Sequence, residues 1–220
     1  MICAIVLAAG RSSRMGVQKL LLPFAGKTVI SHIVDQLLAS TVDRIFVVAG
    51  HQPERISTEL SGRPISIVHN ADYDCGMLSS VRCGLHSLPK RCKAVLVAIG
   101  DQPSISTELV NLMIRSFDAG QKKILVPCYE GKRGHPVLFS SLYREEVLTR
   151  YDDVGLRGLL HAHPDEVFEL TVSTPSVLSD MDYPEDYRRE LTALNKTERQ
   201  PSNPREASGR DGDNDAAVTV

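Results

Sequence analysis

The sequence predicts an α/β fold: a single domain with a mostly parallel central sheet and helices on both of its faces, in three layers. Short apolar runs rich in β-branched residues alternate along the chain with segments whose apolar residues recur every three or four positions. The 220 residues, of which 42% are hydrophobic and 24% charged, can form one sizeable core. In such a sheet, ligands bind at the carboxyl ends of the strands.

The elements are expected in a regular alternation. The predicted strands are 2–8, 44–49, 65–68, 94–99 and 124–127. The predicted helices between them are 29–39, 54–60, 77–88 and 107–118. The last of these has a favourable N-cap in Ser106 and an acidic first turn in Glu108. Further along, a strand, a helix, a strand and a helix are expected at 134–139, 155–162, 167–172 and 184–194.

The end of the chain has a different composition. From Asn195 onward it is polar and rich in Asn, Asp, Arg, Ser, Gly and Pro. Such a segment buries too little apolar surface to offset its ordering entropy. We therefore expect an ordered domain over residues 1–194 and a disordered polar tail, or tether, over residues 195–220.

Composition also narrows the possible partners. A formal net charge of −2 gives no reason to expect nucleic acid or an acidic membrane as a partner. No apolar run reaches the roughly 18 residues that a membrane span needs. The first apolar stretch lacks a basic segment before it, so we expect a cytoplasmic protein. The five cysteines form no Cys-x-x-Cys pair, and neither zinc nor a catalytic thiol is expected.

Cations and hydroxyls gather in a loop directly after the first predicted strand. The apolar run breaks into a segment that carries Gly10, Arg11, Ser12, Ser13, Arg14, Gly16 and Lys19. Backbone N–H groups in a tight glycine turn point at an anion and fixed charges neutralise it, so this loop predicts a phosphate site. Its spacing fits neither a Walker A loop nor a Gly-x-Gly-x-x-Gly fingerprint. The alternative is an ordinary strand-to-helix turn with solvated arginines.

A carboxylate stands at the same edge of the predicted sheet. Asp101 follows the strand at 94–99 and is expected beside the phosphate loop. There it can bind Mg²⁺, a hard cation that prefers oxygen ligands and bridges to substrate phosphates. The alternative is that Asp101 supports a turn or caps the next helix, for which Ser106 is the better N-cap.

Five motifs, taken in order, resemble one known family. Residues 7–19 have the pattern Leu-Ala-Ala-Gly-x-Ser-x-Arg-Met-Gly-x-x-Lys, which resembles nucleotidyltransferases that join a nucleoside monophosphate to a phosphorylated acceptor. The others are Gly-Met-x-x-Ser from Gly76, Gly-Asp-Gln-Pro from Gly100, Arg-Gly-His-Pro-Val-Leu-Phe from Arg133 and Asp-x-Gly-x-Arg from Asp153. Together they are similar to molybdenum cofactor (molybdopterin) cytidylyltransferases, within the molybdopterin-guanylyltransferase-like NTP transferases, over about residues 1–194.

The resemblance implies a Rossmann-like nucleotidyltransferase domain that transfers CMP from CTP to Mo-molybdopterin and releases pyrophosphate, with Mg²⁺ as cofactor. The catalytic residues it implies are Arg14, Lys19 and Asp101. The metal ligands it implies are Asp101 and Asp182, the second in a late Asp-x-Asp-x-Pro-Glu-Asp segment. The same segment also fits a helix N-terminus, with Asp182 as a cap before Pro184.

The resemblance also assigns the two binding sites. The nucleotide-binding residues it implies are Leu7, Ala8, Ala9, Gly10, Arg11, Ser12, Ser13, Arg14, Lys19, Asn70, Gly76, Ser79 and Asp101. The acceptor-binding residues it implies are Arg133, His135 and Arg157, whose charges suit an anionic pterin phosphate. A solvated basic turn around Arg133 and a plain helix start at Ser79 are the alternatives.

Three other functions stay open. One is the same chemistry with GTP, although the Ala8-Ala9-Gly10 turn resembles the cytidylyl branch and the guanylyl branch usually has Leu-Ala-Gly-Gly there. Another is transfer to a sugar or polyol phosphate. The third is a binding protein that carries the finished cofactor to a molybdoenzyme. A molybdoenzyme or its maturation chaperone is in any case an expected partner, beside CTP and Mo-molybdopterin.

Overall fold

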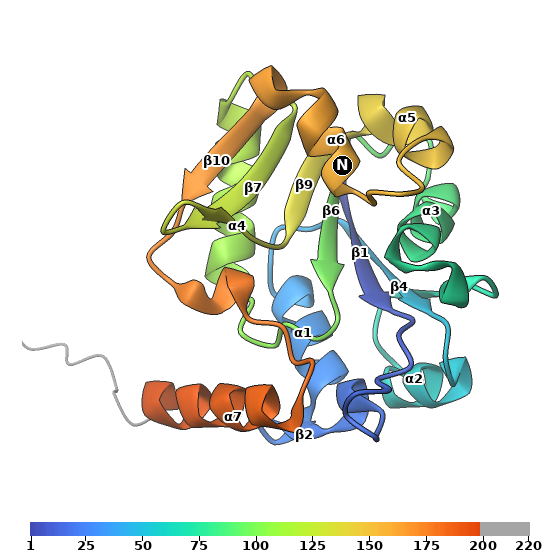
Figure 1. Ribbon diagram of the computed structural model, residues 1–220, viewed down its shortest axis with the longest axis vertical. Coiled ribbons are helices and arrows are strands. Elements are labelled where there is room, and N and C mark those ends of the chain that lie inside the picture. Colours follow the sequence, from blue (N-terminus) through green and yellow to red (C-terminus); the bar gives the residue numbers. More distant parts are fainter. Residues whose placement is uncertain (199–220) are drawn as a thin grey trace, which may run out of the picture.

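The main sheet runs through the middle of the molecule, shown in Figure 1 as a computed structural model in which residues 1–198 are described. Its strands, in sheet order, are β10 (Val167–Thr171), β7 (Ile124–Tyr129), β9 (Val137–Ser140), β6 (Ala94–Ile99), β1 (Ile2–Ala8), β4 (Arg44–Ala49) and β5 (Ser66–His69). Strand β9 is antiparallel to both of its neighbours, and the other neighbouring pairs in this order are parallel. The short β8 (Lys132–Arg133) pairs with β7, and β2 (Pro23–Phe24) and β3 (Lys27–Thr28) form a separate hairpin. The mostly parallel sheet is therefore confirmed.

The helices cover both faces of the sheet. They are α1 (Val29–Leu38), α2 (Pro53–Glu59), α3 (Met77–Ser87), α4 (Thr107–Ala119), α5 (Arg144–Thr149), α6 (Arg157–Ala162) and α7 (Pro184–Glu198). Side chains from alternate positions of β1 enter two separate apolar cores, such as Val6 in one and Ile5 in the other. Apolar side chains of α1, α2 and α4 belong to the first core, and those of α3, α5 and α6 to the second. This arrangement confirms the three predicted layers.

The order of the strands creates a crevice between β1 and β6. After β1 the chain builds β4 and β5 on one side, then crosses back to form β6 on the other side of β1. The carboxyl ends of β1 and β6 meet there, with Leu7 opposite Ile99. A reversal of this kind is the usual place for a ligand in an open α/β sheet. The loops after β1 and β6 carry the predicted phosphate site and Asp101.

Most predicted elements are confirmed within a residue or two, and the exceptions have local causes. The strand predicted at 134–139 begins at Val137, because the N–H groups of Gly134 and His135 bond to the carbonyls of Pro127 and Val177 and not to the sheet. The peptide bond between His135 and Pro136 is cis. The helix predicted at 155–162 begins at Arg157, after a turn at Gly155. Helix α5 was not predicted at all.

The last helix is longer than the sequence predicts. Helix α7 continues past Leu194, the predicted end of the helix, to Glu198. The rest of the predicted tail, residues 199–220, lies outside the described residues. Within the described part of the chain, no helix combines the length and apolarity needed to cross a membrane.

Candidate active site

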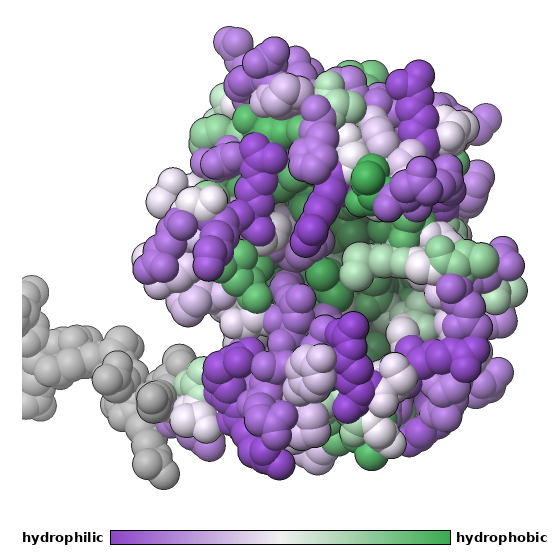
Figure 2. All heavy atoms as spheres, viewed as in Figure 1, coloured by the Kyte–Doolittle hydropathy of each residue, from purple (hydrophilic) through white to green (hydrophobic). Residues whose placement is uncertain are grey.

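A pocket of about 310 Å³ opens at the carboxyl ends of β1 and β6. The face shown in Figure 2 is hollowed there, with hydrophobic surface inside and hydrophilic side chains around it. The pocket is lined by Leu7, Ala9, Gly10, Ser12, Ser13, Arg14, Lys19, Leu20, Tyr73, Gly76, Met77, Ser80, Ile99, Asp101 and Asp182. The predicted phosphate loop and the predicted metal ligands therefore lie around one cavity.

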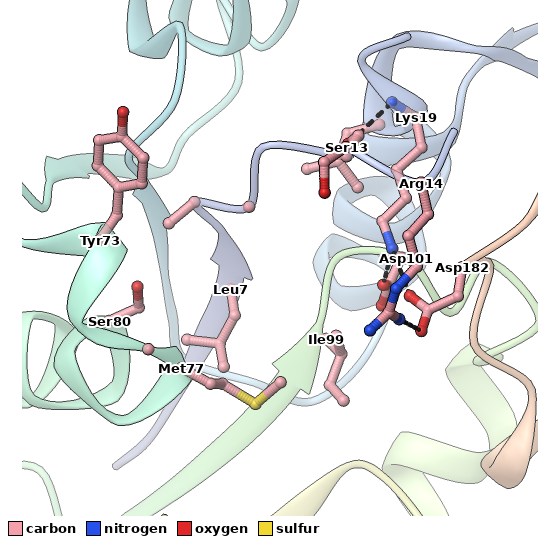
Figure 3. Close-up of a pocket in the computed structure, with 15 residues that line it drawn as sticks. Leu7, Ser13, Arg14, Lys19, Tyr73, Met77, Ser80, Ile99, Asp101 and Asp182 are labelled. Atoms are coloured by element: carbon pink, nitrogen blue, oxygen red, sulfur yellow. Dashed lines mark hydrogen bonds and ion pairs between the residues drawn. The ribbon is translucent and has the colours of Figure 1, made fainter. Parts of the chain in front are cut away.

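Charged side chains gather on one wall of this pocket (Figure 3). The Lys19 Nζ atom lies 2.5 Å from Asp101 Oδ2 and 3.1 Å from Asp182 Oδ1. Arg14 Nη1 lies 2.5 Å from the other oxygen of Asp182. The loop after β1, the loop after β6 and the segment before α7 each supply part of this cluster. Two cations and two carboxylates, joined in this way, can hold a polyphosphate together with a divalent cation.

The loop after β1 is shaped to present Lys19. Ser12 adopts a left-handed backbone conformation with φ of 54°, and its hydroxyl accepts a hydrogen bond from the Lys19 N–H group at 3.2 Å. The same hydroxyl donates to Gln18 Oε1 at 2.9 Å. These bonds start the short 3₁₀ helix Lys19–Leu21 and point the lysine side chain into the pocket.

Asp101 is the buried carboxylate of the cluster. Its side chain is 13% exposed, and burial raises the pKa of its carboxyl above the ordinary 3.8, while the charge of Lys19 opposes that rise. Its Oδ1 atom is buried and has no hydrogen-bond partner among the described residues. A buried oxygen left without a donor is costly, so this atom is suited to a cation or to a donor on a ligand.

Asp182 is held beside Asp101 and does not cap the last helix. Asp186 accepts hydrogen bonds from the N–H groups of Asp182 at 3.1 Å and Tyr183 at 2.9 Å, so Asp186 caps α7. The alternative role of Asp182 as a helix cap is therefore not observed, since its carboxylate pairs with Arg14 and Lys19. The Met181 N–H group donates to the carbonyl of Asp101 at 3.1 Å, which keeps this segment against the loop after β6.

The opposite wall of the pocket is formed by the start of α3 and the turn before it. Gly76 has a φ of 93°, which suits glycine, and the helix begins at the next residue. Ser80 faces the pocket, whereas Ser79 donates to the carbonyls of Asp72 and Gly76. The buried Asn70 amide donates to both serine hydroxyls, at 2.9 Å and 3.0 Å. Asn70 thus lies behind the pocket wall and fixes the start of α3.

Of three other predicted nucleotide-binding residues, one lines the pocket and two do not. Ala8 is fully buried in the core that contains α1 and does not line the pocket. Arg11 binds Asp74 with both ends of its guanidinium, at 2.7 Å and 2.5 Å, and lies 5.4 Å from the centre of the Tyr73 ring. Arg11 therefore joins the loop after β1 to the turn before α3. By contrast, Ser13 lines the pocket as predicted.

Several residues that line the pocket are missing from the nucleotide-binding set that the resemblance implies. They are Leu20, Tyr73, Met77, Ser80 and Ile99. Ser80 lies in the same Gly-Met-x-x-Ser motif as Gly76, so its position carried information. Met77 belongs to the same motif, whereas Leu20 and Ile99 carried no such information, since apolar residues at that spacing are expected in any core.

The predicted acceptor residues are not all brought together. Arg133 pairs with Glu169 on β10 at 2.7 Å. His135 lies further along, where its N–H group donates to the carbonyl of Val177 at 2.9 Å and its Nδ1 atom is buried without a hydrogen-bond partner among the described residues. Arg157 is exposed at the start of α6, and its charge acts on the His135 ring. Of the three residues, Arg133 is thus engaged by an ion pair with Glu169.

The environment of His135 predicts a pH-dependent stability. Burial lowers the pKa of its ring below the ordinary 6.5, Asp180 opposes this, and Arg157 lowers it further. The stability that neutral His135 contributes is fully present above pH 6.5 and is lost as the pH falls through the lowered pKa. We expect the His135→Gln variant to lose less unfolding free energy between pH 7.5 and 5.5 than the wild type does, measured by urea denaturation. The exposed His161 on α6 provides the control, since His161→Gln should follow the wild type; equal losses in all three proteins would refute the assignment.

Comparison with known proteins gives matches that span most of the chain. Residues 4–167 match the MobA-like NTP transferase domain. The chain is 25% identical over 184 residues to the molybdenum cofactor cytidylyltransferase of Escherichia coli K12, covering 83% of this chain and 92% of that one. It is 28% identical over 199 residues to the nicotine blue oxidoreductase of Paenarthrobacter nicotinovorans, covering 86% and 96%.

Solved structures show the same architecture. The crystal structure of Rv0371c from Mycobacterium tuberculosis H37Rv matches with a TM-score of 0.75 and 30% identity, covering 87% of this chain and 98% of that one. A structure of Rv0371c in complex with manganese matches with a TM-score of 0.73 and 29% identity, with the same coverage.

Proposed function

This chain belongs to the MobA-like NTP transferase family, and on that premise we propose that it transfers CMP from CTP to Mo-molybdopterin. The products are molybdopterin cytosine dinucleotide and pyrophosphate. The family supplies the class of reaction, nucleotidyl transfer. The choice of CTP and of the acceptor is the proposal, and it is supported by the relative from Escherichia coli and by the motifs around the pocket.

One observation carries the proposal: Lys19 lies between two carboxylates at the carboxyl ends of β1 and β6, with Arg14 beside it. An anionic acceptor oxygen attacks the α-phosphorus of CTP and forms the new P–O bond. The bond to the β-phosphate breaks, and its electron pair leaves with pyrophosphate. Because the nucleophile is already anionic, no strong base is required, and catalysis consists of positioning and charge stabilisation.

The two walls of the pocket suggest how CTP lies in it. The triphosphate would lie along the wall of Arg14 and Lys19, and the nucleoside along the wall of Tyr73, Met77 and Ser80 (Figure 3). As it binds, Lys19 and Arg14 exchange carboxylate partners for phosphate oxygens. Their ion pairs in the structure keep both side chains pointing into the pocket before the nucleotide arrives.

The residues present fit a magnesium ion. Asp101 offers a buried oxygen without a donor, and Asp182 offers a second carboxylate beside it. Two carboxylates leave positions for phosphate oxygens and water, which is the usual coordination of Mg²⁺ with nucleotides. When bound, Mg²⁺ would supply charge neutralisation to the pyrophosphate. The known manganese complex of Rv0371c is consistent with a divalent cation in this fold.

A second relative has a different activity, so the proposal of nucleotidyl transfer must be supported by the residues of the pocket as well as by the family. The nicotine blue oxidoreductase covers nearly the whole chain at a slightly higher identity than the cytidylyltransferase does. The cluster of Arg14, Lys19, Asp101 and Asp182 favours transfer, because its two cations can neutralise a polyphosphate and its two carboxylates can hold a divalent cation.

The proposal is tested by pyrophosphate release with Mo-molybdopterin as acceptor, with CTP and GTP run in parallel and with Mg²⁺ present or removed by chelation. We expect release with CTP, little release with GTP, and none after chelation. Release with GTP would keep the reaction and overturn the base. No release with either nucleotide, in protein shown to bind CTP, would favour a different acceptor or a carrier.

A further inference from the structure

Arg82 connects the nucleotide wall of the pocket to the loop 150–156, which leads into Arg157 at the start of α6. It lies on α3, and its guanidinium makes hydrogen bonds to three groups of one segment. Its Nε donates to the carbonyl of Val147 at 3.0 Å, Nη2 to the carbonyl of Arg150 at 2.7 Å, and Nη1 to the carboxylate of Asp152 at 2.6 Å. The Arg82 side chain is only 23% exposed, so this fork is held in place by its surroundings.

One end of this connection is the nucleotide wall. Gly76, Met77 and Ser80 at the start of α3 line the pocket. Arg82 lies in the following turn, on a helix whose Val81 and Leu85 are fixed in the apolar core. Any shift of Arg82 relative to the pocket therefore requires a shift of the helix itself.

The other end is a compact loop. The carbonyl of Tyr151 accepts hydrogen bonds from Val154 at 3.2 Å and Gly155 at 2.8 Å, and the carbonyl of Gly155 accepts one from Gly158 at 2.9 Å. The loop is thus closed by hydrogen bonds of its own backbone. The Tyr151 hydroxyl donates to Glu146, which fixes the same loop to α5.

We propose that Arg82 is a positioning residue, which sets the distance between the nucleotide site and the acceptor site by holding the loop of Arg157 against α3. Hydrogen bonds attach the loop to α5 through Tyr151 and to α3 through Arg82, and the bonds of Arg82 refer it to the helix that forms the nucleotide wall. The inference rests on the proposed function, since it assumes that Arg157 meets the acceptor.

The first test is steady-state kinetics of the Arg82→Gln, Arg82→Lys and Asp152→Asn variants. A lost set of charge-assisted hydrogen bonds should raise KM for Mo-molybdopterin about 10-fold in Arg82→Gln, with KM for CTP unchanged. Arg82→Lys should recover part of the loss, and Asp152→Asn should lose least, because Asp152 is 71% exposed and both backbone contacts remain. Arg188→Gln, which removes an exposed arginine of α7 paired with Glu185, is the matched control.

The kinetic outcomes separate positioning from a merely structural role. If Arg82 only stabilises the end of α5, Arg82→Gln will lower the melting temperature and change both KM values alike, or neither. Either result would overturn the inference. A selective rise in KM for the acceptor, at an unchanged melting temperature, supports it.

A second measurement keeps the inference separate from the proposed function. Amide hydrogen exchange is followed at Val154, Gly155 and Gly158 with and without CTP and Mg²⁺. We expect CTP to slow exchange there in the wild type and not in Arg82→Gln. If the wild type shows this protection but transfers nothing to Mo-molybdopterin, the proposed function fails and the connection stands. Equal protection in both proteins, or none in the wild type, overturns the connection.

Discussion

Replacing Lys19 with Met should reduce kcat about 1,000-fold. Lys19 is the cation that Asp101 and Asp182 share, and its side chain is 12% exposed, so its charge acts on the phosphates with little screening by water. Methionine keeps the length and apolar stem of the side chain but removes the charge. The measurement is single-turnover transfer at saturating CTP, which separates chemistry from binding.

The control for this variant is Lys27→Met. Lys27 also forms an ion pair, with Asp35 at 2.7 Å, but it lies at the hairpin before α1, away from the pocket. Lys27→Met should keep full turnover. Lys19→Met should lose about 1–3 kcal/mol of unfolding free energy, since it leaves Asp101 with less compensation. Turnover that survives in Lys19→Met, or that falls only in step with the folded fraction, would remove Lys19 from the mechanism.

The Asp101→Asn variant should also lose about 1,000-fold in kcat, but without a loss of stability. Asparagine keeps the shape of the side chain and removes the charge that a divalent cation needs. Because burial raises the pKa of Asp101, the charged carboxylate is disfavoured in the folded protein, and neutral asparagine should match or exceed the wild type in unfolding free energy. Turnover is measured over a Mg²⁺ titration, in which the variant should require far more Mg²⁺ than the wild type does.

Asp35→Asn is the matched control for that variant. Asp35 lies on α1, where it forms ion pairs with Lys27 and Arg63 away from the pocket. Its replacement should therefore leave both kcat and the Mg²⁺ requirement unchanged. If Asp101→Asn and the wild type respond alike to Mg²⁺, Asp101 does not hold the metal. The loss would then reflect a changed position of Lys19 instead.

The central strands and helices were predictable because the pattern of apolar residues along the sequence marks them. Strands β1 and β6 are continuous apolar runs, and β4 is one after its first residue, Arg44. Helix α4 has both its cap at Ser106 and its apolar face in the sequence. Helix α5 was missed because it is short and contributes only Val147 to the fully buried core. The late start of β9 was missed because hydrogen bonds to distant carbonyls, which no local pattern contains, decide it.

The charged part of the candidate site was predictable from the predicted order of strands and loops. Charged residues that follow strands, such as Lys19 and Asp101, meet because parallel strands bring their carboxyl ends together. The role of Asn70 behind the pocket wall, and the pairing of Arg133 with Glu169, depend on which side chains happen to be within reach in the folded chain. Spacing in the sequence cannot show which side chains these are, so neither contact could be predicted.

The most direct test of nucleotidyl transfer is to follow the phosphorus atoms of the nucleotide. CTP labelled at the α-phosphate and CTP labelled at the γ-phosphate are each incubated with the protein, Mg²⁺ and Mo-molybdopterin, and the labelled products are separated. Attack at the α-phosphorus predicts that the α-label appears in the acceptor and the γ-label in pyrophosphate. A γ-label in the acceptor, or an acceptor without either label while CTP is consumed, would contradict the account.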